Sequence, residues 1–333
     1  MASKEILKHN GNVVPEINDD PETLFGDYET YSRNTVDALL RALQLHSGYD
    51  WTGKVIACEG ESLTGNAVMG YPAYVAEQTG ATVHNLGIGG KAVFPDEAGA
   101  SCDFRRRLSR IPANVDAIII MGDCNSGWLA DCTKPHSFKI EDWSGRWNLA
   151  LDAIRKSFPT VPVFLVFEWA GPMGTNREHQ VRHIPESLWR MANWHGMIFV
   201  NLATESPLNL RYADSVWGLT DGDHTHTNHE AMPLFADVII RHLRQIPPPV
   251  WQGYDTISIE EQTVEVAVGS TVKLTVTKAG DLSSRWTSDN MDVACVLGGV
   301  VYGMAAGTAT ITATTRNGNT ASCVVTVVET ATA

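Results

Sequence analysis

Residues 54–65 read KVIACEGESLTG, an apolar run that passes directly into a polar turn in which Ser62 lies between glycines. The run predicts a buried strand, and the turn predicts the loop that leads from this strand into a helix. A serine on such a sharp turn suits a nucleophile held at the end of a strand. The same residues also fit an ordinary strand-to-helix turn in which Ser62 caps the helix, and this motif alone favours that second interpretation.

The strand–loop–helix pattern continues as far as residue 243. Further strands are expected at residues 81–86, 117–121, 161–167 and 197–202, and helices at residues 72–79, 147–157 and 231–243. Apolar strands that alternate with helices predict a parallel sheet covered on both faces, which is an α/β fold. Functional groups of such sheets lie at the carboxyl ends of the strands. The loops after Cys58, Leu86 and Met121 are therefore the places to search.

Three further loops carry candidate residues. Residues 85–90 read NLGIGG, and their closely spaced glycines let a ligand approach the backbone, although the spacing differs from the G-x-G-x-x-G of dinucleotide sites. Residues 122–127 read GDCNSG, and residues 221–230 read DGDHTHTNHE. Three histidines and two aspartates could bind a metal, but they lack the helical HExxH spacing. Neither a metal nor another cofactor is expected.

Together these loops resemble the sequence blocks of the SGNH (GDSL-type) hydrolase family, in the family's order. The segment GESLT at 60–64 is similar to the Gly-Asp-Ser-Leu/Ile-Thr block, with Glu61 in place of Asp, and NLGIGG is similar to the second block. Residues 223–231 resemble the block Asp-x-x-His-Pro-Asn-x-x-Gly, with Thr227 and Ala231 in place of Pro and Gly. The third block departs from the family's Gly-x-Asn-Asp, because GDCN at 122–125 moves the Asn one residue along.

The resemblance covers residues 54–243 and implies a flavodoxin-like three-layer fold with the chemistry of a serine esterase. It implies that Ser62 is the nucleophile, that His226 takes its proton, and that Asp223 orients His226. The register Asp221 with His224 also fits Asp-x-x-His but loses the Asn that follows, so Asp223 and His226 are preferred.

The same resemblance implies an oxyanion hole. Its donors are expected to be the backbone N–H groups of Ser62 and Gly90 together with the side-chain amide of Asn125. Asn125 can fill this place if a local bulge absorbs the extra residue. If it cannot, the hole has two donors, and the loss of one donor typically costs ~10²–10³ in rate.

The chain has 333 residues, which predicts about two domains. Residues 1–50 are expected to form an N-terminal arm, with a hairpin turning at Asn10-Gly11 and a docking helix at 28–45. Residues 51–246 are expected to form the hydrolase-like domain. Three consecutive prolines at 247–249 predict a stiff linker over residues 247–254. The linker has few side chains to tie domains together, so the tail at 255–330 is expected to fold independently.

The tail resembles a bacterial Ig-like domain of group 2 (BIG2). The matching segments are VGST at 268–271, WTSDN at 286–290 and GMAAGTATITA at 303–313. Independently of this likeness, Ala309, Ile311 and Ala313 alternate with polar residues, as in strands of a small β-sandwich. Trp286 is expected in the core of this sandwich. Whether Cys295 and Cys323 pair remains open.

The charge and hydropathy of the chain argue against several classes of function. The net charge is −13, and an acidic chain is repelled by phosphate backbones, so nucleic acid is not an expected partner. No apolar run of ~18 residues predicts a membrane span. The first twenty residues lack the apolar core of a Sec-type signal peptide. The run of Arg105, Arg106 and Arg107 is interpreted as a solvated helix face rather than an anion site.

These observations favour an SGNH-type serine esterase that removes acetyl or other acyl groups from carbohydrate. Synthesis in the cytoplasm and display on a phage particle or bacterial surface are expected, with virion or cell-surface components as further partners. The alternative is a non-catalytic decoration or adhesion protein that binds surface glycans. Glu61 and the altered third block favour the alternative, whereas the complete Ser62, Asp223 and His226 set opposes it. The acyl group, the sugar, the host and the oligomeric state are not predicted.

Overall fold

The structure is a computed structural model, and it describes residues 8–9, 12–13, 48–65, 70–89, 103–122, 135–139, 142–167, 177–206, 226 and 228–329. The chain divides into two compact units, Met1–Ser47 and Gly48–Ala333. In the first unit, β1 (Lys8–His9) and β2 (Asn12–Val13) pair antiparallel, on either side of the predicted Asn10-Gly11 turn. The helix predicted at 28–45 lies outside the described residues.

The second unit begins with a parallel sheet. Its strands are β3 (Val55–Gly60), β4 (Thr82–Asn85), β5 (Ala117–Met121), β6 (Val163–Phe167) and β7 (Ile198–Asn201), in the spatial order β4-β3-β5-β6-β7. Every neighbouring pair is parallel. Counted by first appearance, this order is 2-1-3-4-5, that of flavodoxin-like folds. The predicted α/β class and flavodoxin-like architecture are confirmed.

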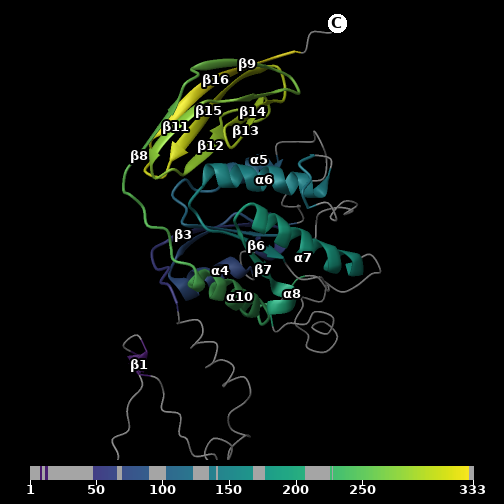
Figure 1. Ribbon diagram of the computed structural model, residues 1–333, viewed down its shortest axis with the longest axis vertical. Helices are drawn as coiled ribbons and strands as arrows, with labels where there is room; N and C mark the ends of the chain where they lie inside the picture. The colour runs from purple at the N-terminus through teal and green to yellow at the C-terminus, as the bar shows by residue number, and fades with distance from the viewer. Residues whose placement is uncertain are drawn as a thin grey trace, which may run out of the picture. The chain divides into compact units, whose positions relative to one another are not determined.

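Helices cover both faces of this sheet (Figure 1). They are α3 (Ser62–Gly65), α4 (Tyr71–Thr79), α5 (Asp103–Ser109), α6 (Trp143–Ser157), α7 (Arg177–Trp194), α8 (Leu202–Glu205) and α10 (Met232–Gln245). α4 and α10 pack against each other, and α5, α6 and α7 contribute to a core on the other face. None of the described helices is long and apolar enough to cross a membrane.

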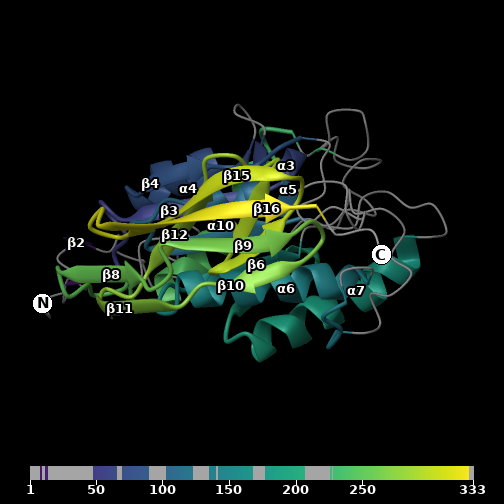
Figure 2. The same ribbon diagram turned by 90° about the horizontal axis from the view of Figure 1, so that it is seen from above.

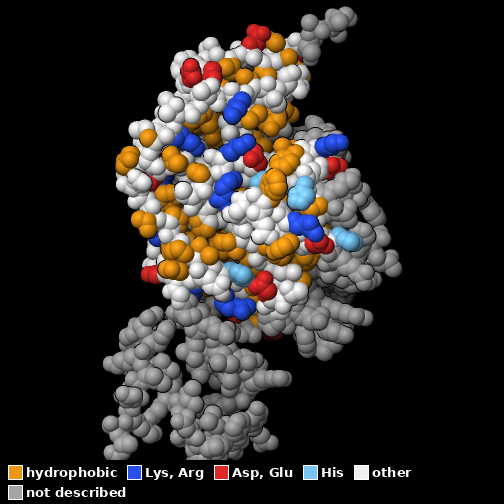
Figure 3. All heavy atoms as spheres, viewed as in Figure 1, with side chains coloured by type: hydrophobic (Ala, Val, Ile, Leu, Met, Phe, Trp, Pro, Cys, Tyr) orange, Lys and Arg blue, Asp and Glu red, His pale blue; other side chains and the backbone are white. Residues whose placement is uncertain are grey.

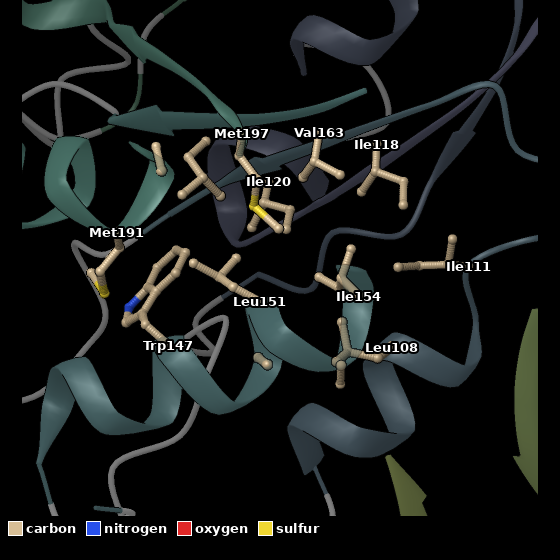
Figure 4. Close-up of a cluster of buried hydrophobic side chains, with 14 of the residues drawn as sticks. Leu108, Ile111, Ile118, Ile120, Trp147, Leu151, Ile154, Val163, Met191 and Met197 are labelled. Atoms are coloured by element: carbon tan, nitrogen blue, oxygen red, sulfur yellow. The ribbon is translucent and has the colours of Figure 1, made fainter. Parts of the chain in front are cut away.

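The core beneath α5, α6 and α7 explains why this face is stable. Figure 4 shows Trp147, Leu151 and Ile154 of α6 pointing toward Ile118 and Ile120 of β5. All five side chains are at most 1% exposed. Burial of such side chains is worth ~1.5–3 kcal/mol each. Because β5 and β6 are covered on both faces, they are apolar at every position, as AIIIM and VFLVF.

The C-terminal part of this unit is all-β. Its strands are β8 (Asp255–Ile259), β9 (Thr263–Ala267), β10 (Thr271–Lys273), β11 (Val276–Gly280), β12 (Ser284–Ser288), β13 (Ala294–Leu297), β14 (Val300–Gly303), β15 (Gly307–Thr315) and β16 (Thr320–Val328). The sheets are β12-β15-β16-β9, β10-β14-β13 and β11-β8. β16 and β9 are parallel neighbours, side by side in Figure 2.

The interior of this β-sandwich follows the predicted alternation. Ala309, Ile311 and Ala313 are at most 3% exposed, and Trp286 is 7% exposed, so Trp286 is a core residue as expected. Cys323 is also buried there and carries a free thiol, so no Cys295–Cys323 bridge forms.

The linker was expected to have few side chains that tie the domains together, but its Trp251 does so, and residues of the sandwich add further contacts. Asp116 is 1% exposed and accepts hydrogen bonds from Trp251 Nε1 at 2.6 Å and from Arg316 Nη2 at 3.0 Å. The Arg316 guanidinium lies 3.9 Å from the centre of the Trp251 ring. Leu297 of β13 belongs to the same hydrophobic cluster as α5 and α6. The two domains therefore share a packed interface, and Figure 1 shows α5 and α6 between the sandwich and the parallel sheet.

Candidate active site

Ser62 is the first residue of α3, directly after the carboxyl end of β3. The backbone turns sharply there, because the amides of Thr64 and Gly65 both donate to the Glu61 carbonyl, at 3.1 and 2.7 Å. Ser62 is half-buried, whereas the flanking Glu61 is fully buried. The predicted position of the serine, on a turn between a strand and a helix, is confirmed. Its role as the nucleophile stays a prediction.

The glycine loop after β4 packs directly on this turn. Ile88 N–H donates to the Gly60 carbonyl at 3.0 Å, and the Asn85 side chain donates to the Thr64 carbonyl at 2.7 Å. A Cβ atom on Gly87 would lie only 2.4 Å from the Gly65 nitrogen. The glycines thus permit the close approach of two backbones.

The second loop also reaches the candidate nucleophile. A Cβ atom on Gly89 would lie 3.9 Å from Ser62 Cβ, so the loop passes beside this serine. Gly90 and Asn125, the other two expected oxyanion donors, lie outside the described residues.

The loop that precedes α10 carries His226, whose side chain is half-buried. Two contacts orient α10 relative to α4: the Tyr74 hydroxyl meets the His229 carbonyl at 3.3 Å, and Arg244 donates to the Gln78 carbonyl at 2.7 Å. Tyr74 precedes Gln78 in α4, and His229, just before α10, precedes Arg244 near its end, so the two helices run in the same direction.

Because α4 follows the Ser62 turn, the parallel course of α4 and α10 brings both preceding loops to one edge of the sheet. Ser62 and His226 therefore lie on loops at the carboxyl edge of the sheet, although 164 residues separate them in the sequence. Asp223, and the alternative pair Asp221 and His224, lie outside the described residues.

A buried ion pair lies beneath the turn, and sequence reasoning missed it. Arg107 of α5 is 3% exposed, and its Nε donates to Glu59 Oε1 at 2.6 Å. The interpretation of the arginine run as a solvated helix face is therefore wrong for Arg107. Burial raises the pKa of Glu59 to about 7, because lost hydration outweighs the Arg107 charge.

The strand beneath the site also holds a cysteine. Burial raises the pKa of the Cys58 thiol to about 12, so this thiol stays protonated at neutral pH and is a poor nucleophile. Among the described residues no group of three His, Cys, Asp or Glu side chains could hold a metal ion. Most of residues 221–230 lie outside the described residues.

The C-terminal part of the chain matches a known protein family. Residues 254–325 match the family described as bacterial Ig-like domain (group 2). The C-terminal sandwich is a bacterial Ig-like domain. No curated protein matches the chain.

Solved structures resemble the α/β domain. A Lactobacillus plantarum protein has 18% identity and a TM-score of 0.47, covering 58% of this chain and 97% of its own. The acetylxylan esterase Axe2 of Geobacillus stearothermophilus has 16% identity and a TM-score of 0.42, covering 58% and 94%. A Desulfitobacterium hafniense protein assigned to the G-D-S-L lipolytic family has 15% identity and a TM-score of 0.41, covering 57% and 99%.

The Ig-like domain packs on the helix that carries Arg107. Arg106 of α5 forms an ion pair with Asp292, and α5 contacts β12 and β13. On the face in Figure 3, acidic, basic and hydrophobic side chains are interspersed over the described part of both domains. The short helix α5 therefore lies between the Ig-like domain and the Ser62 turn.

Proposed function

We propose that this protein is a serine esterase of the SGNH type. The observation that carries the proposal is the position of Ser62, on a turn at the carboxyl end of β3 with the glycine loop packed beside it. The His226 loop at the same edge supplies a general base. The complete Asp223-x-x-His226 motif adds support from the sequence.

The proposed reaction follows from these groups. The Ser62 hydroxyl attacks the ester carbonyl while His226 takes its proton, and Asp223 stabilises the imidazolium that forms. The Ser62 and Gly90 N–H groups and the Asn125 amide bind the negative oxygen of the tetrahedral intermediate. His226 then returns the proton to the leaving alcohol. Water releases the acyl group from Ser62 by the same steps.

The finer part of the proposal concerns the substrate and its setting. Acetyl or other acyl esters of carbohydrate are the proposed substrate, and a phage particle or bacterial surface is the proposed location. The Ig-like domain supports this setting, because such a domain serves as a spacer or adhesive unit on a displayed enzyme. Release of acetate from acetylated polysaccharide, and detection of the chain in purified virions, would test the two parts separately.

The activity itself is tested with p-nitrophenyl acetate. Ser62→Ala and His226→Ala should each lower kcat by several orders of magnitude, with little further loss in the double variant, because triad members act as a unit. His224→Ala is the matched control and should keep most of the activity, whereas Asp223→Asn should lower it through the wrong imidazole tautomer. Additive losses, or inactivation by EDTA, would contradict the proposal and favour a metal site.

A glycan-binding protein without turnover is the second candidate. Glu61, fully buried where the family pattern has Asp, favours it, as does the displaced Asn125. A fluorophosphonate probe separates the two candidates, because only an activated serine reacts. Labelling of the wild type that disappears in Ser62→Ala supports the esterase. Glycan binding without labelling supports the second candidate.

A further inference from the structure

Arg107 reaches from α5 to the backbone of the Ser62 turn. Its Nε atom donates to Glu59 at 2.6 Å, and its Nη2 atom donates to the Gly60 carbonyl, two residues before Ser62. The side chains of Arg107 and Glu59 are 4% and 0% exposed. The guanidinium is thus buried directly below the loop that presents the candidate nucleophile.

The Gly60 carbonyl is a junction between three segments. It belongs to the last residue of β3, it accepts the Ile88 N–H of the glycine loop at 3.0 Å, and it accepts the Arg107 guanidinium of α5. Gly89, the next residue of the glycine loop, lies beside Ser62. A displacement of this carbonyl would therefore move the serine relative to the loop expected to bind the oxyanion.

We propose that Arg107 is a positioning residue, which holds the Gly60 carbonyl so that Ser62 and the glycine loop keep the geometry needed for attack. The inference rests on the proposed function, because it assigns Arg107 a role in that reaction. Arg107 touches no reacting atom and acts through the Gly60 carbonyl. A misplacement of about 1 Å can lower a rate by ~10²-fold.

The chemistry of the pair supports positioning rather than stability. A buried ion pair is a weak source of folding stability, since hydrophobic residues of similar volume often serve as well. An arginine offers a planar fork of donors that can reach two acceptors in fixed directions, whereas lysine offers a point charge. Here one arm of the fork meets Glu59 and another meets Gly60. Glu59 takes up one arm of the fork and leaves the second arm for the backbone.

Arg107→Lys tests this inference in the full chain, since it keeps the charge but not the two-armed reach. Arg110→Lys, at an exposed position in the turn that follows α5, is the matched control. We expect Arg107→Lys to lower kcat for p-nitrophenyl acetate ~10²-fold with KM within twofold, and to speed hydrogen exchange in the peptide containing Ile88. The control should change neither quantity.

Four outcomes decide the matter. Unchanged kcat and unchanged Ile88 exchange in Arg107→Lys would overturn the inference, as would a loss of kcat that accompanies faster exchange throughout the chain. If Arg107→Lys does not fold, Glu59→Gln decides: a lower kcat at unchanged KM supports positioning, and an unchanged kcat refutes it. If the wild type neither turns over ester nor reacts with a fluorophosphonate, the proposed function is wrong. In that case, hydrogen exchange at Ile88 in Arg107→Lys alone tests whether Arg107 holds the Gly60 carbonyl.

Discussion

Gly87 is the residue on which the fit between the two loops of the site depends. A Cβ atom there would meet Gly65 backbone atoms at 2.4 and 2.7 Å, whereas a Cβ atom on Gly89 would meet Ser62 Cβ at 3.9 Å. We therefore expect Gly87→Ala to lower both the melting temperature and kcat, because backbone atoms cannot yield as a flexible side chain can. Gly89→Ala should leave the melting temperature nearly unchanged. Equal melting temperatures for the two variants would contradict this interpretation.

Glu59 makes stability depend on pH in a predictable direction. Burial raises its pKa from 4.5 to about 7, so the native state holds this proton more tightly than the unfolded chain does. The resulting stabilisation is complete below pH 4.5 and is lost as the pH rises through 7, at no more than ~1.4 kcal/mol per pH unit.

Urea unfolding at pH 5 and pH 8 measures this effect. The free energy of unfolding of the wild type, minus that of Glu59→Gln, should fall between the two values. Glu77→Gln, at an exposed position on α4, removes the same charge and should track the wild type. A difference between wild type and Glu59→Gln that stays constant with pH would show that Glu59 does not titrate in this range.

At the scale of elements, apolar runs were sufficient to predict strands, and polar helices were not predictable. β5 was predicted at its observed bounds. Where strands alternate with helices along the chain, a run of five consecutive apolar residues predicts a buried strand. α7 was missed, since Pro185 and several charged residues interrupt its apolar spacing. The run Arg105–Arg107 was interpreted as the solvated face of a helix, and nothing in the run itself marks Arg107 as buried. The partner that buries Arg107 is Glu59, 48 residues earlier, and such a pairing is set by the fold rather than by local sequence.

The Asn228 side chain, within the segment 223–231, stabilises the turn that leads into α10. Asn228 Oδ1 accepts the N–H groups of Glu230 and Ala231, each at 3.1 Å. We expect Asn228→Ala to lower the free energy of unfolding by ~1 kcal/mol, the usual net contribution of a hydrogen bond within a protein. Asn228→Asp keeps an acceptor and should lose less. Equal losses in urea unfolding would show that this oxygen does not stabilise the turn.

At the scale of the whole molecule, the two domains were predictable as folds but not as a joined pair. Composition changes at the prolines, and the alternation of Ala309, Ile311 and Ala313 predicted a sandwich correctly. The contacts between the domains depend on residues such as Asp116 and Arg316, 200 positions apart. From the sequence alone, a charged residue is expected on the surface. Only the assembled fold shows that Asp116 is 1% exposed.

This interface predicts that the domains unfold together. Besides its contacts with Trp251 and Arg316, Asp116 accepts the Val55 N–H at 2.8 Å, so the pair with Arg316 is anchored to the start of β3. Arg316→Met removes the cation while retaining an apolar stem, and it leaves the Asp116 carboxylate without that partner. Loss of one member of a buried pair costs ~3–5 kcal/mol, and Arg316 is partly exposed, so we expect the lower end of that range.

Calorimetry should therefore give one transition for the wild type and a lower melting temperature, or two separate transitions, for Arg316→Met. Hydrolysis of small esters at 25 °C should change little in this variant, because Asp116 precedes β5 at the edge of the sheet opposite to Ser62. Asp292→Asn, which removes an exposed contact between the same domains, is the matched control and should cost under ~1 kcal/mol. Two transitions already present in the wild type would show that the Ig-like domain folds by itself, as its own alternating core first led us to expect.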